Sequence, residues 1–270
     1  MPTVTEIRDR TDDTPITMLT AYDAPTASIV DDSGVDMILV GDSVGNVMLG
    51  HDSTLPVTLD QMVSHTSAVV RGAEDALVVA DVPFLSVGAD EGDSIENCGR
   101  LLKEAGADAV KIESGDHTVK LTEQLVQLGI PVMAHLGLTP QQVNQLGGHT
   151  RQGTTPEAAR EILDLATEHQ RAGAFALVLE HVPSNLAAQV TETLDIPTIG
   201  IGAGPACDGQ VLVVNDAVGL SDWTPPFVET FGDVRGEMES AIDDYVTAVE
   251  DGEYPAEEHS HHEDELEDIY

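Results

Sequence analysis

Basic residues are scarce in this chain of 270 residues, which has 11 lysines and arginines against 49 aspartates and glutamates and a formal net charge of −38. Such a charge repels nucleic acid and anionic membranes, so we expect neither as a partner. Lysine occurs only at Lys103, Lys111 and Lys120, and aromatic residues make up 3% of the chain. An acid-rich, lysine-poor surface suits concentrated salt, because at about 1 M the Debye length is only about 3 Å. The composition therefore favours the cytoplasm of a halophile.

Disulfide and membrane-anchoring features are also lacking. The two cysteines, Cys98 and Cys207, do not have the spacing of a disulfide framework or a metal site. The opening MPTVTEIRDR lacks the basic start and apolar stretch of a signal peptide. No apolar run approaches the roughly 18 residues of a membrane span. We expect a soluble, cytoplasmic protein.

Short apolar runs recur along the chain. They are mostly continuous rather than alternating, which is typical of strands buried on both faces of a parallel sheet. The runs cover residues 16–21, 37–40, 76–80, 109–112, 130–134, 175–179, 196–201 and 210–214. Segments with helical character lie between them, for example at 59–72, 93–106, 117–129, 155–173 and 184–194.

The alternation of strand and helix predicts a (β/α)8 TIM barrel, because eight such units in roughly 250 residues match that fold. Thr139-Pro140 and Thr155-Pro156 fit helix starts, with a capping hydroxyl before a proline. Glycines at the helix-to-strand junctions fit the left-handed position that ends a helix. These are Gly34, Gly72, Gly106, Gly129 and Gly173. A doubly wound open sheet is the main alternative, but no nucleotide-binding fingerprint follows the first run.

Polar residues gather where the apolar runs end. Because barrel enzymes build their sites at the carboxyl ends of several strands, these side chains could converge on one pocket. They are Asp23, Asp42, Ser43, Asp81, Lys111, Glu113, His135, Glu180 and Asp216. A single acid at a strand end says little in so acidic a chain. An acid that directly abuts a core run, as in LVVAD, AVKIE and ALVLE, says more, because a carboxylate there is costly unless it is paired or bound to a metal.

Lys111 stands inside an apolar run of a chain that has almost no lysine. It lies two residues from Glu113, and the period of a strand places both side chains on the same face. Inside a barrel, that face points toward the site. A structural ion pair is the alternative interpretation.

Several strings of the chain resemble ketopantoate hydroxymethyltransferase. They include LTAYDAP at 19–25, ILVGDSVGNV at 38–47, GADAVKIESG at 106–115, VMAHLGLTPQQVNQLGG at 132–148 and IGIGAGPACDGQVLV at 199–213. The resemblance extends in the family's order from about residue 15 to residue 260. It implies a barrel of the phosphoenolpyruvate/pyruvate-utilising type that transfers a hydroxymethyl group from 5,10-methylenetetrahydrofolate to 2-oxoisovalerate (3-methyl-2-oxobutanoate). That reaction is the first committed step of pantothenate and coenzyme A synthesis.

The resemblance also implies roles for individual residues. Asp42 and Asp81 would ligate a divalent metal, usually Mg²⁺, with Glu113 completing the site. Ser43 and Lys111, together with the two aspartates, would hold the 2-oxo acid. Glu180 would be the general base that forms a metal-stabilised enolate, with His135 beside the reacting carbon.

Three other functions are compatible with parts of this pattern. A different Mg-dependent 2-oxo acid lyase or mutase on a related barrel would share the enolate chemistry. Lys111 could instead form a Schiff base, as in metal-independent aldolases. A catalytically dead or regulatory barrel is the alternative outside enzymology.

The expected organisation is a single barrel domain over residues 1–255, followed by an acidic, histidine-containing tail at 256–270. The resemblance implies a homo-oligomer, since the family often forms decamers. Small molecules, namely the 2-oxo acid and the folate, are the other expected partners.

Overall fold

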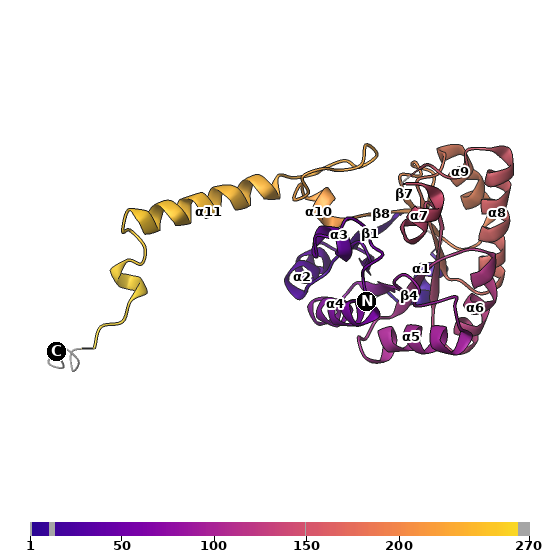
Figure 1. Ribbon diagram of the computed structural model, residues 1–270, viewed down its shortest axis with the longest axis horizontal. Coiled ribbons are helices and arrows are strands. Elements are labelled where there is room, and N and C mark those ends of the chain that lie inside the picture. The colour runs from indigo at the N-terminus through magenta and orange to yellow at the C-terminus, as the bar shows by residue number, and fades with distance from the viewer. Residues whose placement is uncertain (1, 11–13, 149, 264–270) are drawn as a thin grey trace. The chain divides into compact units, whose positions relative to one another are not determined.

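The chain forms a closed barrel of eight parallel strands in the order β1 to β8, as a computed structural model shows (Figure 1). The structure describes residues 2–10, 14–148 and 150–263. Each strand pairs in parallel with its neighbour in the sequence, and β1 pairs with β8 to close the sheet. The prediction of a (β/α)8 barrel is confirmed, and the doubly wound alternative is wrong.

The strands are short and buried. They are β1 (Ile16–Thr20), β2 (Met37–Val40), β3 (Leu77–Asp81), β4 (Ala109–Glu113), β5 (Val132–Gly137), β6 (Ala176–Glu180), β7 (Thr198–Ile201) and β8 (Gly209–Leu212). All eight overlap the predicted runs. At β3, β4, β5 and β6 the strand continues past the predicted end and takes in a polar residue of the candidate site.

Helices between the strands, from α2 to α9, surround the barrel, while α10 and α11 follow β8 (Figure 1). The α-helices are α1 (Val4–Arg8), α2 (Ala24–Asp32), α3 (Val44–Val47), α4 (Leu59–Gly72), α5 (Glu91–Lys103), α6 (Asp116–Gln127), α7 (Val143–Leu146), α8 (Pro156–Arg171), α9 (Ser184–Thr193), α10 (Val214–Ala217) and α11 (Val234–Glu250). Two 3-10 turns are η1 (Pro140–Gln142) and η2 (Glu257–His259).

Two of the predicted helix signals are wrong. Gly72 is the last residue of α4 and does not have a left-handed backbone, unlike the other four glycines named above. A Cβ at Gly72 would lie 2.3 Å from the carbonyl oxygen of Ala24, so close packing of α4 on the start of α2 excludes any side chain there. Thr139 makes no side-chain cap, and only the short turn η1 follows it, whereas Thr155 caps α8 by accepting a hydrogen bond from the backbone of Ala158.

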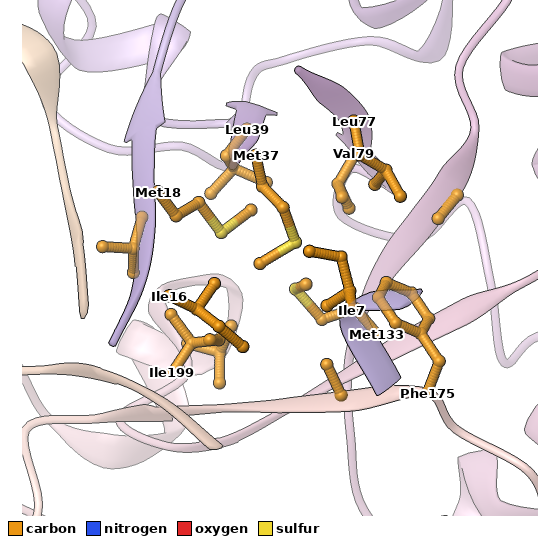
Figure 2. Close-up of a cluster of buried hydrophobic side chains, with 14 residues drawn as sticks. Ile7, Ile16, Met18, Met37, Leu39, Leu77, Val79, Met133, Phe175 and Ile199 are labelled. Carbon is orange, nitrogen blue, oxygen red and sulfur yellow. The ribbon is translucent and has the colours of Figure 1, made fainter. Parts of the chain in front are cut away.

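The barrel interior is filled by apolar side chains from its strands, and α1 closes its amino-terminal end. Ile7 of α1 is fully buried and packs in a cluster with Met37, Met133 and Phe175 (Figure 2). A second cluster lies between β5, β6 and the helices α8 and α9. Both faces of the sheet are therefore buried, as the continuous apolar runs predicted, and the carboxyl ends of the strands remain for polar residues.

The chain divides into two compact units. The first contains residues 1–214 and 225–228, and so holds the whole barrel. The second contains residues 215–224 and 229–270, with α11 and η2. The predicted boundary at residue 255 stays a prediction, and part of the predicted tail, residues 264–270, lies outside the described residues.

Apolar residues recur along α11 at Val234, Met238, Ile242, Tyr245 and Val249, which is the spacing of one helical stripe. None of the residues of α11 is buried within its own unit. In the part of the chain that the structure describes, no helix has the length and apolar content to cross a membrane.

Candidate active site

The alternation of side chains along the strands places polar residues at the mouth of the barrel. In β3, for example, Leu77 and Val79 point into the apolar interior, so Asp81 two residues later points into the same space at the carboxyl end. The same alternation in β4 carries Lys111 and Glu113 inward, and in β6 it carries Glu180 inward. A cavity of about 170 Å³ at this end is lined by Asp42, Ser43, Asp81, Lys111, Glu113, His135 and Glu180. The structure thus brings together every residue of the predicted site.

Asp42 and Asp81 lie beside each other and are both buried. The backbone N–H of Asp42 donates to Oδ2 of Asp81 at 3.0 Å. A Cβ at Gly41 would lie only 2.7 Å from Oγ of Ser43, whereas its distance of 3.5 Å from Oδ2 of Asp81 would be an ordinary contact. The glycine immediately before Asp42 therefore leaves room for the hydroxyl of Ser43.

Lys111 supplies the positive charge of the site. Its Nζ lies 2.7 Å from Oδ1 of Asp81 and 3.3 Å from Nδ1 of His135. Burial alone would lower the pKa of Lys111, but the charges of Asp81 and Asp42 outweigh burial and raise it. The lysine is therefore a protonated ammonium, and the structural ion pair that the sequence left open is present within the site itself.

His135 is neutral and lies between Lys111 and Glu180. Burial and the nearby charge of Lys111 hold the pKa of His135 well below its usual range. An ammonium can only donate, so we assign Nδ1 of His135 as the acceptor and place the ring proton on Nε2. Nε2 lies 3.1 Å from Oε2 of Glu180, without the alignment of a hydrogen bond. The base candidate thus faces the N–H of a neutral imidazole.

Burial makes two of the carboxyl groups hard to ionise. It raises the pKa of Asp42 to about 7, with the charge of Asp81 as the second cause. It raises the pKa of Glu113 to about 9, with the charge of Asp42 as the second cause. Oε2 of Glu113 is buried and has no hydrogen-bond partner among the described residues. Shifted pKa values of this kind, in a cavity, are typical of functional sites.

Two residues that the sequence did not single out hold the site in place. The hydroxyl of Tyr22, which is buried just after β1, lies 2.8 Å from Oγ of Ser43. Gln141, in η1, donates from its side chain to Asp42 and from its backbone to Glu113. A rare aromatic directly after a strand could have pointed to Tyr22. No local pattern distinguishes Gln141 from its neighbour Gln142.

Two of the polar residues at strand ends do not join the cavity. Asp23 caps α2 by accepting a hydrogen bond from the backbone of Thr26 at 2.8 Å. Asp216 belongs to the second unit and accepts from the hydroxyl of Ser221 at 2.5 Å. Both residues make local hydrogen bonds, which is expected for some of the acids at strand ends in so acidic a chain.

The side of the cavity away from the carboxylate pair is apolar. Val178 of β6, Ile201 of β7 and Val211 of β8 line it. Ile201 is the register partner of Glu180 on the adjacent strand. The cavity can therefore take a small acid whose charged end lies toward β2 to β4 and whose hydrocarbon end lies toward β6 to β8.

A larger cavity of about 340 Å³ opens at the opposite end, where β1, β7 and β8 begin. Of the charged residues that line it, Arg10 pairs with Asp36, and Asp208 accepts hydrogen bonds from Thr198. Among the residues that the structure describes, no buried group of carboxylates converges there. We therefore place the candidate active site at the mouth of the barrel, where barrel enzymes react.

A closed (β/α)8 barrel with buried acids, one lysine and a small cavity at the carboxyl ends of its strands defines an enzyme that acts on a small molecule. A family model described as "Ketopantoate hydroxymethyltransferase" matches residues 2–257. The chain belongs to the ketopantoate hydroxymethyltransferase family, as the resemblance predicted.

Relatives with known names agree. The chain is 70% identical over 270 residues to a 3-methyl-2-oxobutanoate hydroxymethyltransferase of Haloarcula marismortui, with all of both chains covered. It is 53% identical over 246 residues to the protein of the same name from Trichlorobacter lovleyi, which covers 91% of this chain and 92% of the relative.

Solved structures show the same type of barrel at low identity. One is 2,3-dimethylmalate lyase, a member of the PEP mutase/isocitrate lyase superfamily, with a TM-score of 0.60, 15% identity, and 95% and 91% of the two chains covered. Another is a phosphonopyruvate hydrolase in complex with oxalate and Mg²⁺, with a TM-score of 0.60, 11% identity, and 96% and 93% covered. These likenesses show the barrel fold and say nothing further about the reaction.

Proposed function

We propose that the mouth of the barrel binds one divalent cation, Mg²⁺ by preference, together with 3-methyl-2-oxobutanoate, and that Glu180 removes the proton from C3 of this acid. The chain is an enzyme of its family, and its reaction is the transfer of a hydroxymethyl group to 3-methyl-2-oxobutanoate, which gives ketopantoate. The observation that carries the proposed mechanism is the convergence of Asp42, Asp81 and Glu113 around Lys111, with Glu180 on the wall of the same cavity.

The donor set fits a hard divalent cation. Three carboxyl groups line the cavity together with the ammonium of Lys111, which pairs with Asp81. Oε2 of Glu113 is buried without a hydrogen-bond partner among the described residues. No group of three or more His, Cys, Asp or Glu side chains in the described ranges is already arranged as a metal site. Mg²⁺ does not need one, because it usually keeps several waters and takes one or two carboxylates together with the substrate. Asp42 and Asp81 would hold it, and Glu113 would act beside them.

When bound, the cation would supply a Lewis acid that stabilises negative charge on the keto oxygen of the substrate. The ammonium of Lys111 would add a second positive charge near the same oxygen. Ser43, whose hydroxyl is held by Tyr22, would donate to the substrate carboxylate. These groups would lower the pKa of the C3 proton, so that a carboxylate could remove it.

Glu180 would then accept the C3 proton, and the N–H of neutral His135 would lie beside its carboxylate. The apolar wall of Val178, Ile201 and Val211 would exclude water from the two methyl groups of the substrate. The resulting enolate carbon would attack the methylene carbon of the one-carbon donor while one carbon–nitrogen bond of the donor breaks. Water would then replace the second nitrogen, supply the hydroxyl oxygen and release the tetrahydrofolate. We propose 5,10-methylenetetrahydrofolate as that donor, which must approach from outside because the cavity of about 170 Å³ leaves room only for a small acid.

The geometry disfavours the other mechanisms that the sequence allowed. A Schiff base needs a neutral amine, whereas Lys111 is buried against Asp81 and its pKa is raised. A lyase or mutase of a related barrel fits less well, since the solved barrels of that kind share only the fold with this chain. The presence of every expected acid argues against a dead barrel.

The test is an assay of ketopantoate formation from 3-methyl-2-oxobutanoate and 5,10-methylenetetrahydrofolate in molar salt. We expect a chelator to abolish activity, Mg²⁺ to restore it, and borohydride with substrate to leave it intact. Activity that resists the chelator but is lost to borohydride would instead establish a Schiff base on Lys111.

We also propose that the chain forms a homo-oligomer, as its family resemblance implies, with a decamer as one form. The apolar stripe of α11 supports this, because a helix face of this length is normally buried against another apolar surface. Light scattering in molar salt measures the assembly. Ile242→Asp places a charge in the middle of the stripe and should shift the mass to smaller species, while a monomeric wild type would contradict the proposal.

A further inference from the structure

One glutamine of the loop after β5 contacts residues that follow or end three other strands. Nε2 of Gln141 donates to Oδ2 of Asp42 at 2.9 Å and to the carbonyl oxygen of Val82 at 3.0 Å. Its backbone N–H donates to Oε1 of Glu113 at 2.9 Å. A single residue thus connects the ends of β2, β3 and β4, the three strands that supply the proposed cation ligands.

These hydrogen bonds fix one oxygen of each of two carboxyl groups. Oε1 of Glu113 is held by the backbone of Gln141, so its buried Oε2 is the oxygen that remains for a cation or its water. Oδ2 of Asp42 is held in the same way by the side chain. Groups that hydrogen-bond to a metal ligand in this manner set its orientation, and their loss typically weakens metal binding about 10- to 100-fold.

The loop that carries Gln141 is itself held by the strand of the proposed base. The backbone N–H of Leu138 donates to the carbonyl oxygen of Glu180 at 2.8 Å, and that of Gln142 donates to Thr139 at 2.8 Å. The segment 138–142 is therefore hydrogen-bonded to β6 at one end, and through Gln141 to the carboxyl groups of Asp42 and Glu113. An amide suits its end, because it donates to carboxylates without adding a charge that would compete with a cation.

We propose that Gln141 is a positioning residue, which presents Asp42 and Glu113 to the divalent cation and does not itself touch the substrate. This rests on the proposed function, because it requires a cation at the barrel mouth. Gln142 offers a matched control. It stands next in the same turn η1 and is half-buried like Gln141, and within the described ranges no side-chain hydrogen bond joins it to the site.

The experiment compares Gln141→Met with Gln142→Met in the full chain, in molar salt and at fixed pH. Methionine keeps the length of the glutamine side chain and removes its two hydrogen bonds, to Asp42 and to Val82, while the backbone hydrogen bond to Glu113 stays in place. Calorimetric titration with Mn²⁺ should give a Kd about 10- to 100-fold weaker for Gln141→Met, and an unchanged Kd for Gln142→Met. Turnover by Gln141→Met should recover as Mn²⁺ is raised, whereas a merely structural defect would lower the melting temperature and leave the Kd in place.

The outcomes separate the two proposals. A wild-type protein that does not bind Mn²⁺ would overturn the cation site and the role of Gln141 with it. Equal Kd values for wild type and Gln141→Met would overturn the role of Gln141 alone. If Gln141→Met fails to fold, Gln141→Asn, whose amide is one methylene too short to reach both acceptors, replaces it and should show the same weakening.

Discussion

Binding of a divalent cation to the metal-free protein at pH 7 is expected to release protons. Burial raises the pKa of Glu113 to about 9 and that of Asp42 to about 7. At pH 7 the first group is therefore almost fully protonated and the second about half protonated. A cation that ionises both carboxyl groups should release about 1.5 protons. One that ionises Asp42 alone, with Glu113 acting through a water molecule, should release about 0.5.

Calorimetric titration with Mg²⁺ in two buffers that differ in ionisation enthalpy measures this number directly. Glu113→Gln is the informative variant, because it removes one titrating group and keeps the size of the side chain. If Glu113 ionises on binding, the variant should release about one proton fewer than the wild type. Binding with no release of protons in the wild type would refute the reasoning, because it would mean that the buried carboxyl groups do not respond to the cation.

The same pKa shifts set the sign of the stability change with pH. Raised pKa values mean that the metal-free folded protein holds protons that the unfolded chain has already lost above about pH 4.5. The contribution of these groups to stability is therefore lost as pH rises through about 7 for Asp42 and about 9 for Glu113. Bound cation should oppose this loss, since it favours the ionised carboxylates.

Three further predictions follow from the site and the composition. Asp81→Asn keeps the shape of the side chain but removes the charge beside Lys111. It should lower metal-dependent turnover at saturating Mg²⁺ by about 100-fold or more and leave the circular dichroism spectrum unchanged. Near-wild-type rates would show that Asp81 does not belong to the site. Ile201→Ala should raise kcat/KM for 3-methyl-2-oxopentanoate relative to 3-methyl-2-oxobutanoate by about 10-fold, and an unchanged ratio would show that this wall does not contact the substrate. Removal of salt should unfold the protein, because repulsion among its 49 acids is no longer screened; an equal melting temperature in molar and millimolar salt would contradict this.

The sequence predicted the barrel well because its strands are buried on both faces and so form continuous apolar runs. It placed some strand ends too early for a physical reason. The prediction 130–134 stops before His135, whereas β5 extends over Val132–Gly137, because a barrel strand can carry polar side chains inward at the mouth. The residues that broke the apolar pattern were those of the site.

The site residues could be predicted because the alternation of side chains along each strand fixes which of them point into the barrel. Lys111 and Glu113 share a face through the period of the strand, and Asp81 follows by the same rule. The contact of Gln141 with Asp42 could not be predicted in this way, since it joins residues 99 positions apart through a loop. Gly72 shows the same limit, because its need to lack a side chain comes from packing against Ala24, far away in the chain.

Exchange of the C3 proton of 3-methyl-2-oxobutanoate with deuterium from the solvent, in molar salt and without the one-carbon donor, tests proton removal by Glu180 most directly. Wild-type protein with Mg²⁺ should catalyse the exchange, and either a chelator or Glu180→Gln should stop it while binding of the acid persists. Exchange that continues unchanged in Glu180→Gln, or without any divalent cation, would contradict the account.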